Sequence, residues 1–374
     1  MDEQPELSPE LGLRREVQYE YSKDFLPVLE HLNCSILIST YSAGKVVCVG
    51  SYEGKLDLSF HNFEQAMGMA VSTQLAVGSR NQIWFLHNGD DLAAKIEPAG
   101  KHDLCFLTRS AHMTGNIHVH EMAWSRDGQL WVANTLFSCL STLRDEYSFV
   151  PQWRPKFITR LAAEDRCHLN GMAMENGRPK FVTAMAPCNE PAGWRPTKAD
   201  SGIVIDVDSN EIVSQNLCMP HSPRLKNGKL FVLNSGLGAL DCVDLDSGQR
   251  ETVDTMPGYT RGLSFSGQFA FVGLSRIRET SIFGGIPIAE RRDELRCGVV
   301  VLDLVTGRSV AYLEFKTGVD EIFDVQVLPG VRTPMIEGPY PEQDERQPVW
   351  VVPSEKYPAR SRAVTAYSTI RGFD

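Results

Sequence analysis

Two segments decide the fold of this 374-residue chain: HEMAWS (120–125) and QLWVANT (129–135), which are joined by the turn RDG. Two short, mostly apolar runs separated by a polar turn are typical of a β-hairpin. The first run has counterparts along the sequence, and a unit of several short strands that recurs every ~40 to 60 residues predicts a β-propeller. The six aligned segments are AMGMAV (66–71), HEMAWS (120–125), NGMAME (170–175), HSPRLK (221–226), RGLSFS (261–266) and FDVQVL (323–328).

Each aligned segment is the expected innermost strand of one blade. The last, FDVQVL, precedes a proline-rich stretch, whereas residues 36–60 supply three strands with no first strand of their own. A blade built from both parts closes the ring and leaves no exposed sheet edge there. We therefore predict an all-β, six-bladed propeller in which the strand starting near Phe323 pairs with the strand near Ile36. A seven-bladed ring that uses PVWVVPS (348–354) is the alternative.

The repeat also predicts the domain organisation. We expect an N-terminal arm or cap at residues 1–35, with a short helix near DFLPVLEHLN, the propeller at 36–330, and a loosely attached C-terminal tail at 331–374. Two long insertions, 185–202 and 275–298, follow the second strands of their blades. Both should cover the same end of the central channel, which we call the channel mouth.

Composition restricts the class of protein. A hydrophobic content of 42% with 22% charged residues is that of a soluble globular protein. The net charge of −10 argues against nucleic-acid binding, which needs a cationic face. No secretory signal and no membrane-spanning apolar run are recognisable, so we expect a cytoplasmic protein without membrane contact. Nine scattered cysteines fit reduced thiols.

The alignment superposes one residue per blade at the start of the inner strands, near the channel axis. These residues are Met67, His120, Asn170, His221, Arg261 and Asp324. Polar side chains on the axis cost desolvation energy unless they bind a ligand or one another. We assign catalytic roles to His120, His221, Asn170 and Arg261. The alternative is that the two histidines are hydrogen-bonded plugs of a narrow pore.

Further polar and aromatic residues flank the inner and second strands at the same channel mouth. The predicted substrate-binding residues are His118, His168, Arg80, Asn134, Asn234, Tyr259, Arg276, Glu321 and Trp194. For the two asparagines, capping of turns is the alternative. Because loops at one face of a rigid scaffold commonly carry function, this set predicts a binding pocket.

Two kinds of chemistry fit these residues. His120, His221 and Asp324 come from alternate blades, and two nitrogens with one carboxylate suit a divalent zinc, iron or manganese ion. In the metal-free reading a histidine is the general base, Arg261 binds an anion and Asn170 stabilises an oxyanion. Sequence motifs of nucleotide-binding loops, serine hydrolases and zinc proteases are absent.

Several segments resemble an uncharacterised bacterial family of domain-of-unknown-function proteins, some joined to tetratricopeptide repeats. The resemblance spans roughly residues 35–332 and is carried by WVANTLFSCLSTL, EDRCHLNGMAM, CMPHSPRL, PGYTRGLSF and EIFDVQVLPGV, among others. It implies no activity. The six-bladed pattern is more distantly similar to gluconolactonases and calcium-dependent phosphotriesterases, whose metal is held by Glu, Asn and Asp. The histidines and Arg261 depart from that all-oxygen set. Streptogramin lyases are a looser analogy.

Taken together, the sequence predicts an enzyme that acts on a small polar, anionic metabolite or peptide-derived substrate at the channel mouth. Hydrolysis, elimination and isomerisation are the reactions considered. The alternative is a noncatalytic propeller that binds a ligand or another protein. An interaction module would concentrate apolar residues on an exposed face, so the polar ring favours a pocket. The oligomeric state is left open.

Overall fold

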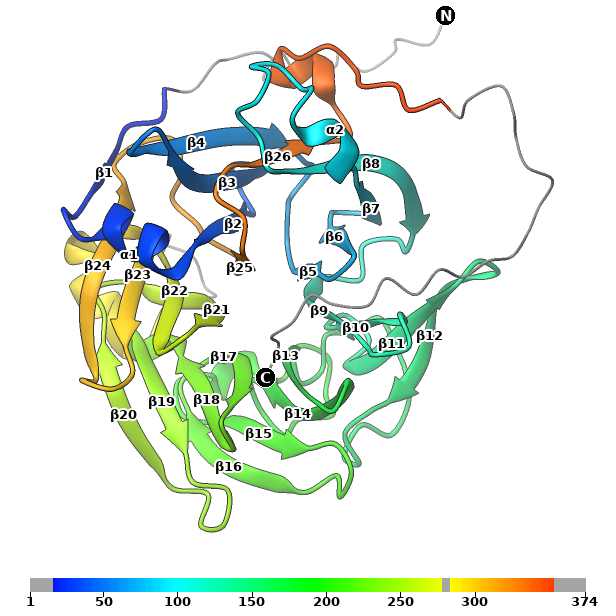
Figure 1. The fold of residues 1–374 in the computed structure, drawn as a ribbon. Helices are drawn as coiled ribbons and strands as arrows, with labels where there is room; N and C mark the ends of the chain where they lie inside the picture. Colours follow the sequence, from blue (N-terminus) through cyan, green and yellow to red (C-terminus); the bar gives the residue numbers. More distant parts are fainter. Residues whose placement is uncertain (1–15, 278–282, 353–374) are drawn as a thin grey trace, which may run out of the picture.

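The computed structural model describes residues 16–277 and 283–352. Their strands form six sheets of four or five strands, arranged in a ring around a central axis (Figure 1). The predicted all-β, six-bladed propeller is confirmed. The seven-bladed alternative is wrong, because residues 348–352 form no strand and the six sheets already complete the ring; residues 353 and 354 lie outside the described part of the chain.

The blades are numbered from the one that closes the ring, and each is given from its innermost strand outward. Blade 1 contains β25 (Asp324–Pro329), β2 (Cys34–Thr40), β3 (Lys45–Tyr52) and β4 (Lys55–Asn62). Blade 2 contains β5 (Met69–Val71), β6 (Gln74–Gly78), β7 (Gln82–Asn88) and β8 (Leu104–Met113). Blade 3 contains β9 (Val119–Trp124), β10 (Leu130–Asn134), β11 (Cys139–Arg144) and β12 (Tyr147–Trp153).

The remaining blades follow in chain order. Blade 4 contains β13 (Leu169–Glu175), β14 (Arg178–Ala184), β15 (Gly202–Asp206) and β16 (Ile212–Leu217). Blade 5 contains β17 (Pro220–Lys226), β18 (Lys229–Asn234), β19 (Ala239–Val243) and β20 (Arg250–Thr255). Blade 6 contains β21 (Tyr259–Ser266), β22 (Phe269–Ser275), β23 (Cys297–Asp303) and β24 (Arg308–Phe315).

Blade 1 joins segments from the two ends of the described chain. β25 pairs antiparallel with β2 over six residues, from Cys34 opposite Pro329 to Ser39 opposite Asp324. The register places Ile36 opposite Val327. The predicted pairing between the strand near Phe323 and the strand near Ile36 is therefore present. Each strand forms hydrogen bonds with backbone groups of the other that would otherwise lie at an open sheet edge.

Two short strands extend the outer edges of the ring. β1 (Tyr19–Tyr21) pairs antiparallel with β24 of blade 6, and β26 (Pro334–Glu337) pairs parallel with β8 of blade 2 (Figure 1). The Asp103 carboxylate accepts hydrogen bonds from the backbone N–H groups of Arg332 and Thr333, which fixes the chain just before β26. The first residues of the expected C-terminal tail are thus part of a propeller sheet.

The helices in the described residues are few and short. They are α1 (Phe25–Leu32), α2 (Asp90–Ala93) and the 3-10 helices η1 (Arg195–Thr197), η2 (Ser235–Leu237), η3 (Pro287–Glu294) and η4 (Pro341–Asp344). None of the helices in the described part of the chain has the length or apolar character needed to span a bilayer.

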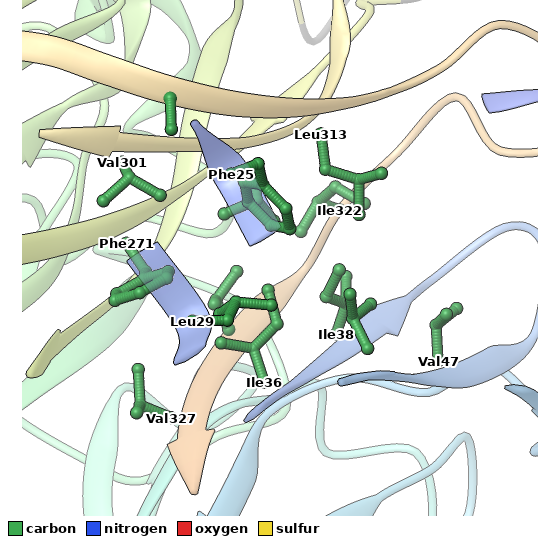
Figure 2. Packing of buried hydrophobic residues seen from close by; sticks show 14 of the residues in the cluster. Phe25, Leu29, Ile36, Ile38, Val47, Phe271, Val301, Leu313, Ile322 and Val327 are labelled. Carbon is green, nitrogen blue, oxygen red and sulfur yellow. The ribbon is translucent and has the colours of Figure 1, made fainter. Parts of the chain in front are cut away.

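Helix α1 covers the hydrophobic core between blades 1 and 6. Its Phe25 and Leu29 side chains are fully buried and pack among Ile36, Phe271 and Leu313 (Figure 2). The helix ends at Asn33, which adopts a left-handed conformation that asparagine tolerates well. The helix predicted near DFLPVLEHLN is therefore present, and it seals the core beside the closing blade.

Side chains of inner strands connect neighbouring blades around the axis. The backbone N–H of Met69 donates to Asp324, that of Met172 to Glu121, and that of Gly262 to Ser222. Gly262 has a φ of +79°, and a Cβ there would lie 2.5 Å from the backbone nitrogen of Val325. Only glycine therefore allows blades 6 and 1 to approach this closely.

Candidate functional site

A cavity of about 310 Å³ lies at the channel mouth, where the loops that precede the inner strands meet those that follow the second strands. We call it the mouth cavity. Nine of the predicted site residues line it: His118, His120, His168, Trp194, His221, Tyr259, Arg261, Arg276 and Glu321. Its other lining residues are mostly aromatic or apolar, including Tyr41, Phe283 and Phe323. A rim of apolar surface around a few polar groups is typical of small-molecule pockets.

The two long insertions contribute to the mouth cavity, as predicted. Met185, Trp194 and Arg195 come from the first insertion, and Arg276, Ile277 and Phe283 from the second. Residues 278–282 of the second insertion lie outside the described residues. The insertions share one buried cluster, in which Met185 and Trp194 pack with Ile277, Ile286 and Ile288. They therefore form a packed wall of the cavity.

His120 and His221 are held by equivalent contacts in blades 3 and 5. Nδ1 of His120 lies 2.8 Å from Thr135 Oγ1 and 3.2 Å from the carbonyl oxygen of His118. Nδ1 of His221 lies 3.0 Å from Ser235 Oγ and 3.1 Å from the carbonyl oxygen of Met219. Because a carbonyl oxygen only accepts, each Nδ1 carries the hydrogen and each Nε2 carries the lone pair.

Burial keeps both of these rings neutral. Desolvation lowers the pKa of His120 and that of His221 well below the usual value, and the Arg261 guanidinium nearby lowers them further. The two ring centroids lie 6.2 Å apart. In the neutral form, each Nε2 is a hydrogen-bond acceptor or proton acceptor.

His168 differs from these two because its partner is a carboxylate. Its Nδ1 lies 2.9 Å and 3.0 Å from the two carboxylate oxygens of Asp165. Trp194 Nε1 donates to Asp165 Oδ2 at 3.1 Å, and the Trp194 ring contacts the His168 ring at a centroid distance of 4.4 Å. Asp165 and His168 both have positive φ values, 47° and 51°. These conformations bring the two side chains together although they lie in a loop.

Arg261 is the principal cation of the mouth cavity. Its guanidinium carbon lies 3.5 Å from the centroid of the Phe323 ring, and Nη1 lies 3.7 Å from Glu321 Oε1. The side chain is 11% exposed. A mostly buried guanidinium with one long ion pair retains hydrogen-bond donors for a further anion.

Two of the five polar residues aligned near the channel axis do not line the mouth cavity. Asn170 accepts a hydrogen bond from Thr183 Oγ1 at 2.7 Å, and His168, two residues earlier, lines the cavity instead. Asp324 accepts from the backbone of Met69 and from Gln326 Nε2. In the last repeat the alignment is shifted by one residue, since Phe323 lines the cavity where Asp324 was expected.

Three other predicted binding residues lie outside the mouth cavity. Asn134 accepts a hydrogen bond from the backbone N–H of Phe137 and so caps the turn after β10. Asn234 accepts from the backbone N–H of Cys218 and donates to Asp241. Arg80 forms an exposed ion pair with Glu64. The contact of Asn134 with Phe137 is the one expected from the alternative interpretation, in which this asparagine caps a turn.

The predicted metal ligands do not assemble into one site. His120 and His221 line the mouth cavity, whereas the Asp324 carboxylate is engaged by backbone and amide donors outside it. Within residues 16–277 and 283–352, no group of three His, Cys, Asp or Glu side chains is arranged to hold a metal ion. The divalent-metal hypothesis stays a prediction, for which metal analysis of the purified protein is the direct measurement.

Three residues that orient the histidines of the site were not predicted from the sequence. Thr135 and Ser235 orient His120 and His221, and each directly follows an asparagine that was chosen instead. Asp165 orients His168. The spacing D-x-x-H in EDRCHLN was the available signal for Asp165, but only the loop conformation shows that the two side chains meet.

The ring of six sheets and the mouth cavity define a six-bladed β-propeller with a pocket of histidines, arginines and apolar side chains at one end of its channel. The chain belongs to the family described as a domain of unknown function, DUF4915, which matches residues 23–336. This agrees with the family resemblance seen in the sequence. No curated protein sequence matches the chain.

Three solved structures are similar to the chain. A chain in the crystal structure of a nidogen/laminin complex has a TM-score of 0.50 at 9% identity, with 79% of this chain and 99% of that chain covered. A protein of unknown function from Bacteroides caccae has a TM-score of 0.48 at 11% identity, covering 79% and 98%. Virginiamycin B lyase from Staphylococcus aureus has a TM-score of 0.39 at 10% identity, covering 74% and 79%. Similarity at these identities concerns the fold alone.

Proposed function

We propose that the mouth cavity binds a small organic anion, a metabolite or peptide-derived molecule, and transforms it by hydrolysis, elimination or isomerisation with imidazole acid–base chemistry. The observation that carries the proposal is the Arg261 guanidinium, mostly buried in a cavity that also contains four histidines. A buried arginine whose one ion pair, with Glu321, spans 3.7 Å retains hydrogen-bond donors and favours binding of an anion.

The contacts of Arg261 support this role. Its ion pair with Glu321 spans 3.7 Å, and no hydrogen bond of 3.5 Å or less joins its guanidinium to another described residue. Phe323 covers one face of the guanidinium plane and leaves its edge for hydrogen bonding. A carboxylate could therefore accept two parallel hydrogen bonds at that edge.

The charges around the mouth cavity also favour an anion. Among the described residues, three arginines line it (Arg195, Arg261 and Arg276) against two carboxylates (Asp165 and Glu321), so the formal charge of this described lining is positive while the histidines are neutral. The Arg276 guanidinium donates hydrogen bonds to Asp320 and to the carbonyl oxygen of Phe315. Arg261 therefore has more donors available for an anionic ligand.

The apolar lining indicates that the anion also has an apolar part. Met185, Ile277 and Phe283 face the same cavity as Arg261. Burial of apolar surface contributes about 25 cal/mol per Å² to binding. A carboxylate attached to an aromatic or aliphatic body therefore fits the cavity better than a small inorganic anion.

Calorimetric titration with benzoate and its neutral analogue benzamide tests the anion site. We expect benzoate to bind and benzamide to bind at least about tenfold more weakly. The Arg261→Gln variant should lose about tenfold to hundredfold in benzoate affinity, because hydrogen bonds between charged groups contribute about 1.5–3 kcal/mol. Arg80→Gln, which removes an exposed arginine outside the cavity, is the matched control.

Two outcomes would decide against parts of this proposal. Equal affinity for benzoate in wild type and Arg261→Gln would exclude Arg261 as the anion ligand. Incubation of the protein with a small-metabolite mixture, followed by mass spectrometry, then separates catalysis from binding. Retention of an anionic metabolite without any conversion would support the noncatalytic ligand-binding alternative.

A further inference from the structure

The histidines of the mouth cavity differ in the acceptor that faces Nδ1. For His120 and His221 the acceptors are a hydroxyl and a backbone carbonyl, both uncharged. For His168 the acceptor is the Asp165 carboxylate, at 2.9 Å and 3.0 Å. An imidazole that gains a proton at Nε2 becomes a cation, and a carboxylate at Nδ1 stabilises that cation far better than a neutral oxygen does.

The Asp165 carboxylate is itself held in place. Trp194 Nε1 donates to Oδ2 at 3.1 Å, and the backbone N–H of Asp165 donates to the carbonyl oxygen of Leu136 at 2.8 Å. The adjacent Arg166 pairs with Glu164 and Asn189, so it does not neutralise Asp165. The Asp165 carboxylate is therefore held facing Nδ1 of His168.

His168 is also placed to reach a ligand. It lines the mouth cavity together with Arg261, and its ring lies edge-on to that of His120 at a centroid distance of 4.8 Å. Because Nδ1–H is committed to Asp165, the lone pair of the neutral ring is on Nε2. No described residue forms a hydrogen bond with Nε2 of His168, so this atom is open to a ligand.

We propose that His168 is the residue that accepts and returns the proton in the mouth cavity, and that Asp165 is its positioning residue. This inference rests on the proposed function. The Nε2 lone pair forms a bond to a proton of the substrate, and the electron pair of the broken C–H or O–H bond stays on the substrate. The resulting anion lies in the cavity that contains the Arg261 guanidinium. The proton then returns to the product or passes to water, which regenerates the neutral ring.

The substrate class follows from this arrangement. It is a small carboxylate with an apolar body and an exchangeable or activated hydrogen that reaches His168 while the carboxylate contacts Arg261. His120 and His221, with their Nε2 lone pairs, supply hydrogen-bond acceptors for hydroxyl or amide groups of such a molecule.

Acylation by diethyl pyrocarbonate, which attacks the neutral imidazole nitrogen, tests the assignment without knowledge of the substrate. The rate at each histidine is followed by peptide mass spectrometry, with exposed His31 on α1 as the internal control. We expect Asp165→Asn to slow acylation of His168 by about tenfold or more, since the ring loses its fixed tautomer and its charged partner. The rate at His31 should not change.

If Asp165→Asn does not fold, a second variant tests the same contact. Trp194→Phe preserves the aromatic ring but removes the N–H donor to Asp165, so it should slow acylation of His168 by a smaller factor. An unchanged rate at His168 in the folded variants, or no reaction of His168 in the wild type, would overturn the assignment.

The two proposals fail separately. Benzoate binding that survives in Arg261→Gln overturns the anion site and leaves the reactivity of His168 untouched. Unchanged acylation of His168 overturns the proton-transfer assignment and leaves benzoate binding untouched.

Discussion

At the residue scale, the repeat places the same kind of hydrogen-bond partners around His120 and His221. Each histidine is the second residue of the inner strand of its blade, and each is oriented by a hydroxyl that follows the second strand of the same blade, Thr135 or Ser235. Blades 3 and 5 therefore present two imidazoles with the same tautomer to one cavity. The neutral state of both rings has a consequence for stability.

The free energy of unfolding should fall on acidification through pH 6.5. Burial lowers the pKa of His120 in the folded protein, so below 6.5 the unfolded chain binds a proton that the folded chain does not. The decrease in the free energy of unfolding between pH 6.5 and 5.5 should therefore be about 1 kcal/mol smaller in His120→Asn than in wild type. Urea unfolding at pH 7.5, 6.5 and 5.5 measures this difference.

Comparison of wild type with His120→Asn separates the effect of His120 on the pH dependence of stability from the effects of other buried groups. Burial raises the pKa of Glu121 to about 7, which favours the folded state as the pH falls from 7 towards 4.5. Both proteins contain Glu121, so this opposite dependence cancels. His31→Asn, at an exposed position, is the control for the substitution itself. Parallel stability curves for wild type and His120→Asn would show that His120 is not a buried neutral residue.

The site was predictable at this scale only as far as the repeat was regular. His120, His221 and Arg261 occupy one aligned position of the repeat and line the mouth cavity, while their roles stay predictions. Errors of one residue had large effects, because adjacent residues of a strand point to opposite faces. Thus Asp324 was chosen where Phe323 lines the cavity. The Asp165–His168 contact depends on left-handed backbone at both residues, which strand periodicity does not encode.

At the element scale, helix α1 has a structural role beyond that of a terminal arm. Leu29 is fully buried in the cluster between blades 1 and 6 (Figure 2). Leu29→Ala should lower the free energy of unfolding by about 2–5 kcal/mol, because it removes buried methyl groups and leaves a cavity. Denaturant unfolding measures the loss, and His31→Ala on the exposed side of the same helix is the control. A loss below about 1 kcal/mol would mean that the helix does not seal the core.

Strands with strong apolar patterns were predictable, whereas edge strands were not. β10, β14, β18 and β22 are mostly buried, and turns such as RDG, ENG and KNG precede three of them. β26 consists of four residues in a proline-rich segment, and its parallel pairing with β8 depends on contacts with Asp103. Such an addition depends on a partner that is distant in sequence, so the local pattern does not reveal it.

At the scale of the whole molecule, ring closure couples the two ends of the described chain. β2, β3 and β4 complete the sheet begun by β25, and the core under α1 contains residues from both (Figures 1 and 2). Sequence alone was sufficient for this feature, because one inner strand lacked partners and three strands lacked an inner strand. Stability should therefore depend on the closing blade more than on any edge strand.

Two truncations test this dependence. Removal of residues 1–60 deletes β2 and most of blade 1, which exposes β25 and the faces of blades 2 and 6, so we expect loss of the cooperative unfolding transition. A chain that ends at residue 331 loses β26 and the residues that follow but keeps all six blades. It should unfold cooperatively at a lower temperature. Differential scanning calorimetry distinguishes the two, and a protein lacking residues 1–60 that unfolds like the full chain would show that closure does not hold the ring together.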